Sequence, residues 1–263
     1  MLIDFYKYHG TGNDFILIDN RTDIFSATTD QIAALCHRRF GIGADGLMLL
    51  NTSKSSAFEM KYYNSDGYES TMCGNGGRCI VALAAKLGVV KQQAEFVAPD
   101  GVHHASIVSQ TANTWVVNLQ MADVLALKKV KRDYILNTGS PHFVRFVNNV
   151  AEYDVFDEGR SIRYFEDYSY DGINVNFVSK LNDGIFVRTY ERGVEDETLS
   201  CGTGVTAASI AWVKAMGLDT GLVEVHTLGG DLKVAFNQQD GVFKNVSLQG
   251  PAQFVFKGSF ELP

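Results

Sequence analysis

The sequence carries two copies of one pattern, and this duplication constrains the fold more than any other feature. Residues 71–80 read TMCGNGGRCI, and residues 199–208 read LSCGTGVTAA. A shift of 128 positions (201 − 73) aligns Cys73 with Cys201 and also aligns three further pairs: Phe15 with Phe143, Tyr62 with Tyr190, and Gly76 with Gly204. Several matches in the same order indicate an internal repeat of one structural unit.

Both copies predict the same order of elements. A first strand (15–18; 143–147) is followed by a variable stretch, which in the first copy is a helix at 29–40 with Thr29 or Asp30 as N-cap and an end before Gly41. Two strands follow (46–50 and 58–63; 174–178 and 185–190), then the Cys-Gly-x-Gly turn and a helix (77–87; 204–216). Short strands separated by turn signals such as PDG, GGD and QDG end each copy.

Strands outnumber helices in this reading, which predicts an α+β fold. We expect two pseudo-symmetric domains, each a curved, mostly antiparallel sheet or barrel around a central helix, with the active site in the cleft between them. The first domain is expected at 1–120 and the second at 133–252, because the strand WVVNLQM gives way near 118–133 to the charged stretch KKVKRDY. The pattern leaves open whether the last strand, 253–263, stays with the second domain or joins the first.

Composition excludes several classes of function. The chain has 263 residues, is 46% hydrophobic and 20% charged, and carries a net charge of −7, which argues against nucleic-acid binding. No segment approaches the ~18 uninterrupted apolar residues of a membrane helix. The N-terminus does not read as a signal peptide, so we expect a cytoplasmic protein.

Four cysteines are too few for a disulfide scaffold of this size, and we expect free thiols in a reducing compartment. Cys73 and Cys79 fit no CxxC spacing and no HExxH motif accompanies them, so no metal site is expected. Cys36 and Cys79 fall within predicted helices and are assigned to packing. His103, His104 and His226 are likewise assigned structural roles.

The Cys-Gly-x-Gly turn has a definite chemistry. The first N–H groups of a helix lack internal partners and carry an effective charge of ~+0.5, so they bind a carboxylate or phosphate that glycines allow to approach. A cysteine at the same position can have its pKa lowered from ~8.5 to as little as ~3.5–7.5. One such turn indicates a nucleophilic cysteine or a phosphate loop.

Two such turns related by duplication favour a different chemistry. If both helix ends meet one ligand carboxylate, the thiols flank the carbon next to it, one on each face. One thiolate can then remove the α-proton while the other thiol delivers a proton to the opposite face, with the carbanion stabilised by the helix N–H groups. Each cysteine needs a partner for its proton, and His142 and Glu191 are the best placed by motif. The scheme requires neither metal nor pyridoxal phosphate.

Five segments together resemble the diaminopimelate epimerase family: HGTGNDFILID (9–19), YYNSDGYESTMCGNGGRC (62–79), GSPHFV (139–144), INVNFV (173–178) and YERGVEDETLSCGTG (190–204). The resemblance runs nearly end to end. It implies a cofactor-independent isomerase that interconverts LL- and meso-2,6-diaminoheptanedioate in lysine and peptidoglycan precursor synthesis. It also implies a homodimer.

The resemblance assigns roles to individual residues. Cys73 and Cys201 are the implied acid/base pair, with His142 and Glu191 as their supports. The implied substrate-binding residues are Asn13, Asn64, Gly74, Asn75, Asn174, Glu191, Arg192, Gly202 and Thr203. Among these, Gly74, Asn75, Gly202 and Thr203 bind the reacting carboxylate through backbone N–H groups, and Asn13, Asn64, Asn174 and Arg192 bind chiefly the far end.

This chain departs from the family pattern at three places. Gly46 stands where many members carry a Gln that touches substrate, Ser140 stands where many carry Asn, and ERGVEDET is one residue longer than the usual ERGxGET. None of these is a proton-transfer residue. The departures bear on recognition of the far end of the substrate.

Other interpretations of the same residues remain open. Cys73 and Cys201 could be small buried residues, Asn64 a turn former, Asn174 a strand-entry residue, His142 a loop histidine, and Arg192 half of a surface pair. The glycine turns could cradle a phosphate, although neither has the Lys-Ser/Thr of a Walker loop. Alternative functions are a racemase or isomerase of another small carboxylate, a cysteine hydrolase using Cys73 with His142, and a catalytically silent module that binds a dicarboxylate.

Overall fold

The computed structural model describes residues 2–168, 170–218 and 221–262. The chain divides into two compact units, and each is described by itself. The first unit is Met1–Leu119 together with Gly250–Pro263, and the second is Gln120–Gln249. Residues 127–130, expected as part of a charged connection, form a strand of the second unit.

The elements of the first unit follow the predicted order. They are β1 (Leu2–Gly10), β2 (Asn13–Asp19), α1 (Thr29–Cys36), β3 (Gly46–Asn51), β4 (Phe58–Asn64), β5 (Glu69–Ser70), α2 (Gly74–Lys86), β6 (Gln93–Ala98), β7 (Gly101–Gln110) and β8 (Thr114–Gln120).

The second unit repeats this order. Its elements are β9 (Leu127–Val130), β10 (Asp133–Asn137), β11 (Pro141–Phe146), α3 (Val155–Arg163), β12 (Asn174–Lys180), β13 (Ile185–Glu191), β14 (Asp196–Thr198), α4 (Gly202–Met216), β15 (Leu222–Thr227) and β16 (Gly230–Gln239). The long strand β17 (Val242–Glu261) ends the chain.

Strand pairing has the same pattern in both units. In the first unit the order β1-β2-β3-β4-β6-β7-β8 is closed by β17, whose second half pairs with both β8 and β1. In the second unit the order is β9-β10-β11-β12-β13-β15-β16, and the first half of β17 pairs with β16. Two pairs in each unit are parallel, β2–β3 and β4–β6, and β11–β12 and β13–β15. The predicted α+β fold with two pseudo-symmetric, mostly antiparallel sheets is confirmed.

The last strand answers a question that the sequence left open. Residues 242–249 of β17 pair with β16 in the second unit, and residues 250–261 pair with β8 and β1 in the first. The chain therefore returns to its first unit at its end. Its partner β1 was not predicted, because LIDFYKYHG alternates buried and exposed residues only in part.

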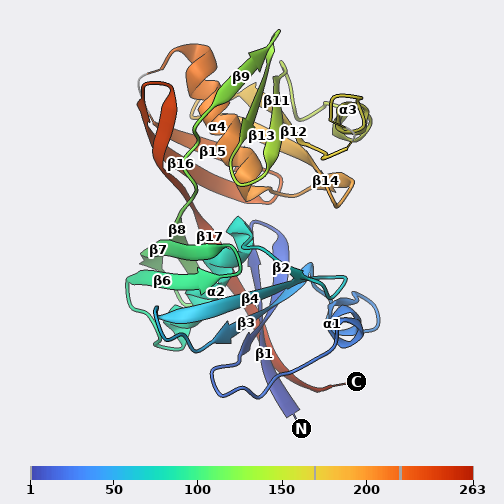
Figure 1. Ribbon diagram of the computed structural model, residues 1–263, viewed down its shortest axis with the longest axis vertical. Coiled ribbons are helices and arrows are strands. Elements are labelled where there is room, and N and C mark those ends of the chain that lie inside the picture. Colours follow the sequence, from blue (N-terminus) through green and yellow to red (C-terminus); the bar gives the residue numbers. More distant parts are fainter. Residues whose placement is uncertain (1, 169, 219–220, 263) are drawn as a thin grey trace. The chain divides into compact units, whose positions relative to one another are not determined.

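A helix lies at the centre of each sheet (Figure 1). Residues 74–84 of α2 are all buried, and α4 is buried at ten of its fifteen positions. A helix that is apolar or small on all sides is typical of a fully enclosed position. Glycine at Gly204 permits this in the second unit, because a Cβ there would collide with the side-chain oxygen of Asn176 on β12. The predicted helices started three and two residues late, since the cysteine-glycine turns are themselves the first helical turn.

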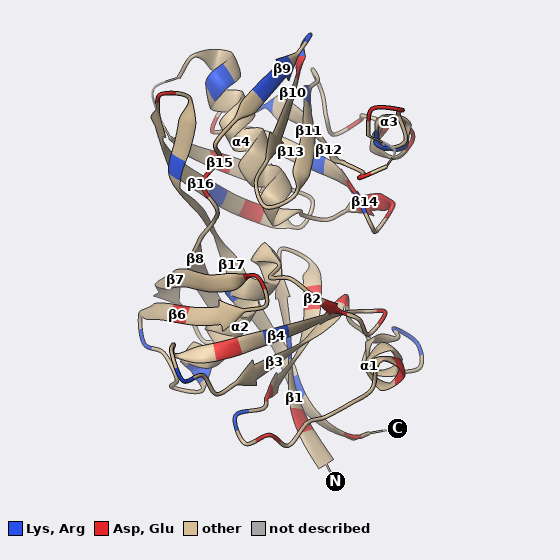
Figure 2. Cartoon of the chain, viewed as in Figure 1, with Lys and Arg blue, Asp and Glu red and all other residues tan. Residues whose placement is uncertain are grey.

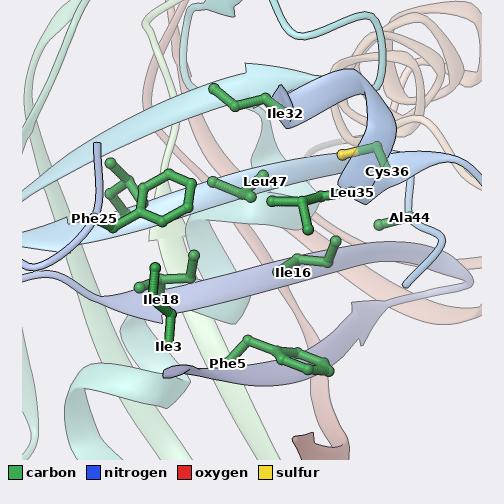
Figure 3. Close-up of a cluster of buried hydrophobic side chains, with 11 residues drawn as sticks. Ile3, Phe5, Ile16, Ile18, Phe25, Ile32, Leu35, Cys36, Ala44 and Leu47 are labelled. Carbon is green, nitrogen blue, oxygen red and sulfur yellow. The ribbon is translucent and has the colours of Figure 1, made fainter. Parts of the chain in front are cut away.

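A second helix covers the outer face of each sheet. In the first unit α1 packs Ile32, Leu35 and Cys36 against apolar residues of β1, β2 and β3 (Figure 3). Buried residues therefore follow one another without alternation in β2 and β3, as expected for strands covered on both faces.

Two details of the helices differ from the sequence prediction. The helix expected at 29–40 ends at Cys36, where His37 leaves the helix with an extended backbone, and its N-cap is Thr28, which forms a capping box with Gln31. Helix α3 was not predicted, because its sequence VFDEGRSIR is polar and carries a glycine.

Acidic and basic residues are interspersed over both units (Figure 2). Among the described residues, no helix is both long and apolar enough to cross a membrane.

Candidate active site

Cys73 and Cys201 occupy the same position in the two units. Each is the N-cap of the central helix, with extended backbone angles of φ −98°, ψ 134° for Cys73 and φ −113°, ψ 114° for Cys201. Their carbonyls accept the first helical hydrogen bonds, from Gly77 at 2.7 Å and from Val205 at 2.9 Å. Neither of these two cysteines forms a disulfide. The repeat thus places each sulfur beside the positive end of a buried helix, where a thiolate or a bound carboxylate is stabilised.

In the first unit the cysteine faces an amide. The Cys73 thiol donates to the side-chain carbonyl of Asn13 at 3.8 Å, and the Asn13 amide N–H donates to the Asp45 carboxylate at 2.7 Å. Arg38 bridges Asp45 and Asp14. The Asp45 carboxylate can only accept, so it fixes the orientation of the Asn13 amide and presents the carbonyl to the sulfur.

A buried cation, Arg78, donates hydrogen bonds to this same turn. Arg78, in the first turns of α2, is fully buried and donates to the Gly74 carbonyl at 3.2 Å and to the Asn75 side-chain oxygen at 2.8 Å. Within the described chain, the salt bridges include none to Arg78. Its charge interacts with Cys73, while burial lowers the pKa of the guanidinium. The side-chain oxygen of Asn75 therefore accepts from Arg78, and the backbone N–H of Asn75 lies at the helix end.

Asn64 lies at the end of β4, directly opposite Gly46 of β3 in the antiparallel register. A Cβ added at Gly46 would lie 2.6 Å from the ring of Tyr62 and 2.5 Å from the Tyr63 carbonyl oxygen. Tyr62 therefore fills the space that a side chain at position 46 would need. This explains in steric terms how glycine is accommodated where the family pattern has glutamine.

In the second unit the cysteine faces hydroxyl groups. The Cys201 sulfur lies 3.5 Å from the Thr203 hydroxyl, which is 3.3 Å from the Ser140 hydroxyl. The Ser140 hydroxyl in turn lies 3.0 Å from Nε2 of His142. Sequence reasoning singled out Thr203 only for its backbone N–H and noted Ser140 only as a departure, so the contact between their hydroxyls was missed.

Two asparagines of β12 hold this cluster. Asn176 donates to Nδ1 of His142 at 3.0 Å, and Asn174 donates to the Ser140 hydroxyl at 3.0 Å. Both asparagines are buried, and their spacing of two residues places them on the same face of the strand. Asn176 was not among the predicted site residues. The N-x-N spacing in INVNFV is the signal that could have identified it.

His142 is completely buried. Burial, together with the nearby positive charge of Arg192, lowers the pKa of its imidazole to about 3. The ring is therefore neutral at physiological pH.

Glu191 ends β13, and Arg192 follows it directly. The Arg192 backbone N–H donates to the Asn174 side-chain oxygen at 2.9 Å, and its guanidinium donates to the Asp171 carbonyl at 2.7 Å. Glu191 accepts from the Thr198 hydroxyl at 2.8 Å. These two bonds hold Arg192 against Asn174 and Asp171.

The two remaining cysteines are in apolar surroundings. Burial raises the pKa of the Cys36 thiol to about 12 and raises that of Cys79 as well. Neither is a reactive thiol under these conditions. No three His, Cys, Asp or Glu side chains among the described residues gather as a metal site.

The second unit thus brings together five of the predicted residues through contacts of backbone and side chain: Cys201, Thr203, His142, Asn174 and Arg192. In the first unit, three predicted residues lie at one helix end: Cys73, Asn13 and Asn75. Cys73 donates to Asn13, and Arg78 donates to Asn75.

Solved structures of other proteins have the same fold. It is shared with a phenazine biosynthesis protein of the PhzF family from Bacillus anthracis (TM-score 0.77, 13% identity, 99% of each chain covered). It is also shared with a hydroxyproline epimerase from Agrobacterium vitis (TM-score 0.67, 12% identity, 98% of this chain and 92% of that chain). At these identities the likeness concerns the fold alone.

Sequence comparison gives the particular family. The family model described as diaminopimelate epimerase matches residues 5–125 and 134–255. A protein named diaminopimelate epimerase from Flavobacterium psychrophilum is 52% identical over 255 residues, covering 96% of this chain and 98% of that protein. The chain therefore belongs to the diaminopimelate epimerase family and is an isomerase.

Proposed function

We propose that this protein converts LL-2,6-diaminoheptanedioate into the meso isomer, with Cys73 and Cys201 as its acid/base pair and without a cofactor. The observation that carries the proposal is the duplicated cysteine N-cap, found in a chain of the diaminopimelate epimerase family. A single nucleophilic cysteine would need only one such turn. Two equivalent thiols suit a reaction in which one proton leaves a carbon and another arrives.

The reaction proceeds by exchange of one proton for another. One cysteine thiolate takes the α-proton, and the electron pair left on carbon is delocalised into the adjacent carboxylate. The other cysteine thiol then gives its proton to the opposite face, so the configuration inverts and the two sulfurs exchange protonation states. Backbone N–H groups of Gly74, Asn75, Gly202 and Thr203 stabilise the charge that builds on the carboxylate.

The far amino-acid end of the substrate is assigned to Asn13, Asn64, Asn174, Glu191 and Arg192. A guanidinium has five N–H donors in a fixed fork, so Arg192 can bind a carboxylate while one N–H donates to Asp171. Carboxylate and amide oxygens suit the far ammonium group. Glycine at position 46 leaves the Tyr62 ring at this edge of the first unit, in place of a longer polar side chain.

His142 and Glu191 support the two thiols and do not touch the reacting carbon in this scheme. The family assignment further supports a cytoplasmic homodimer that acts in lysine and peptidoglycan precursor synthesis. Its product would be consumed by enzymes that require one stereocentre of each configuration.

A stereochemical assay tests the proposal. Purified protein in reducing buffer with a chelator and no pyridoxal phosphate is incubated with the LL isomer, and the isomers are separated by chiral chromatography. We expect the meso isomer to form, and we expect Cys73→Ala and Cys201→Ala each to slow its formation by about 10²–10⁴-fold. Cys36→Ala is the matched control, because that thiol lies in the apolar cluster beneath α1. Absence of meso product from the unmodified protein would overturn the proposal.

A further inference from the structure

The hydrogen bonds around Asn176 fix the protonation pattern of His142. The Asn176 amide nitrogen lies 3.0 Å from the Phe143 carbonyl oxygen, which can only accept, and the Asn176 oxygen accepts from the Thr189 hydroxyl at 2.9 Å. The amide can therefore point in one direction only. Its second N–H faces Nδ1 of His142 at 3.0 Å, so Nδ1 must accept. The neutral ring then carries its hydrogen on Nε2.

The same reasoning fixes the direction of the Ser140 hydroxyl. Asn174 accepts from the Arg192 backbone N–H and donates to the Pro141 carbonyl at 3.1 Å, so its amide nitrogen also donates to Ser140. Ser140 thus accepts from Asn174 and from Nε2–H of His142. A hydroxyl oxygen has two lone pairs and one hydrogen. With both lone pairs engaged, the Ser140 hydrogen points to the Thr203 hydroxyl at 3.3 Å.

Thr203 completes the sequence. Because its oxygen accepts from Ser140, its own hydrogen is available to the Cys201 sulfur at 3.5 Å. We propose that His142, Ser140 and Thr203 form a one-directional chain of hydrogen-bond donors that ends on Cys201 and stabilises its thiolate. In this chain His142 is a positioning residue that donates a hydrogen bond. It is not the base that takes the proton of Cys201.

Burial and charge agree with this direction. His142 is fully enclosed and neutral, so it can anchor the chain at any pH near neutrality without changing its charge. A hydrogen bond donated to the charged form of a group favours that form, and successive donors polarise one another. Arg192, directly after β13, acts on His142 through its positive charge, and Arg192 and its neighbour Glu191 are both left unchanged in the variants below.

The inference rests on the proposed function only for the catalytic use of the thiolate. The chain of donors itself is a property of the free enzyme. Cys73 provides an internal reference, because it faces the Asn13 carbonyl oxygen and has Asn75 where Cys201 has Thr203.

The first experiment measures alkylation of the free enzyme by iodoacetamide from pH 5 to 10, with modification of Cys201 and Cys73 quantified separately by peptide mass spectrometry. Thr203→Val keeps the shape of the side chain and removes the hydroxyl. We expect it to raise the pH midpoint for Cys201 by about one unit, which is about tenfold slower alkylation below the midpoint. Ser140→Ala should produce a smaller shift in the same direction, and Thr203→Ser should retain the original midpoint. The Cys73 midpoint should not move.

The second experiment observes the tautomer of His142 directly by ¹⁵N NMR of histidine-labelled protein, assigned with His142→Gln. We expect a hydrogen on Nε2, none on Nδ1, and no titration between pH 5 and 9. A hydrogen on Nδ1, or an imidazolium in this range, would overturn the proposal, as would a Cys201 midpoint unaffected by Thr203→Val. Neither experiment uses substrate. Failure of the epimerase assay with both results intact would reject the proposed function and leave the donor chain standing.

Discussion

The two cysteine turns have the same backbone conformation, but a charged side chain supports the first and a neutral side chain supports the second. Under the 128-residue shift, Arg78 of α2 corresponds to Thr206 of α4, and each donates to the carbonyl of the first helical glycine, Arg78 at 3.2 Å and Thr206 at 2.9 Å. One turn is thus supported by a buried cation and the other by a neutral hydroxyl. Duplication preserved the helix end, and the side chains behind it diverged.

The strands that precede the helices show the same contrast. Asp14 of β2 corresponds to His142 of β11. Asp14 is ionised and bound by Lys7 and Arg38, whereas His142 is neutral and bound by Ser140 and Asn176. The first unit therefore organises its cysteine with charges, and the second does so with neutral hydrogen bonds. Equivalent roles for the two sulfurs in the reaction do not require equivalent surroundings.

The largest effect is expected when either sulfur is removed. Cys73→Ala and Cys201→Ala should each lower kcat by about 10²–10⁴-fold, the range for loss of one general acid or base. Cys36→Ala should leave kcat unchanged and lower the free energy of unfolding by about 1 kcal/mol, because it removes only one buried sulfur atom. Steady-state kinetics and urea titration measure the two quantities. Full activity in one of the two catalytic variants would show that only a single turn is used.

A large effect on stability is expected from His142. Its pKa is lowered to about 3 in the folded protein from an ordinary value of 6.5. The unfolded chain therefore binds more protons than the folded chain between these values. Stability is fully present above pH 6.5 and falls by several kcal/mol, in order of magnitude, as the pH drops toward 3. Urea unfolding across this range measures the slope, and His142→Gln should flatten it. An unchanged slope in the variant would contradict the neutral, buried histidine.

The contrast between Arg78 and Thr206 predicts unequal losses. Arg78→Met leaves the Gly74 carbonyl and the Asn75 side chain without their buried donor and should lower the free energy of unfolding by about 2–4 kcal/mol. Thr206→Val removes one hydroxyl that bonds within its own helix and should cost about 1 kcal/mol. Equal losses from the two variants would mean that the cation has no special role.

A stability effect confined to strong acid is expected from Asp14. Burial raises the pKa of its carboxyl, but hydrogen bonds from Arg38 and Lys7 outweigh burial and lower the pKa to about 2 from 3.8. The stabilisation is therefore present above pH 3.8 and is lost as the pH falls toward 2, with a magnitude of about 2 kcal/mol. Acid unfolding of Asp14→Asn should lack this component. The pH range of this loss lies below most of the pH range of the loss from His142. One pH titration therefore distinguishes the loss of stability in the first unit from that in the second.

The sequence predicts the parts of the molecule that depend on local pattern. Repeated cysteine-glycine turns and apolar runs such as that of β3 identify the repeat, the α+β class and the central helices. The pattern does not predict α3 or β1, since a polar helix and a strand with only partial alternation are stabilised by tertiary packing.

The candidate site divides in the same way. Cys73 and Cys201 stand out in the sequence because of the glycines that follow them. The hydrogen bonds that join His142 to Ser140 and Asn176, and Ser140 to Thr203, cannot be read from the sequence. They connect β11 and the residue before it with β12 and α4, which only the folded unit brings together. The glycine at position 46 is explained only by the folded structure, because the Tyr62 ring on the neighbouring strand occupies the space of a side chain there.

The account depends most on the claim that one sulfur removes a proton and the other supplies a different one. The direct measurement is early turnover of the LL isomer in D₂O, with the deuterium content of unreacted LL and newly formed meso compound read separately by mass spectrometry. The account predicts deuterium at one α-carbon of the meso product, while the unreacted LL compound retains hydrogen. Deuterium entering the LL compound as fast as the product forms, or product that retains its original hydrogen, would contradict it.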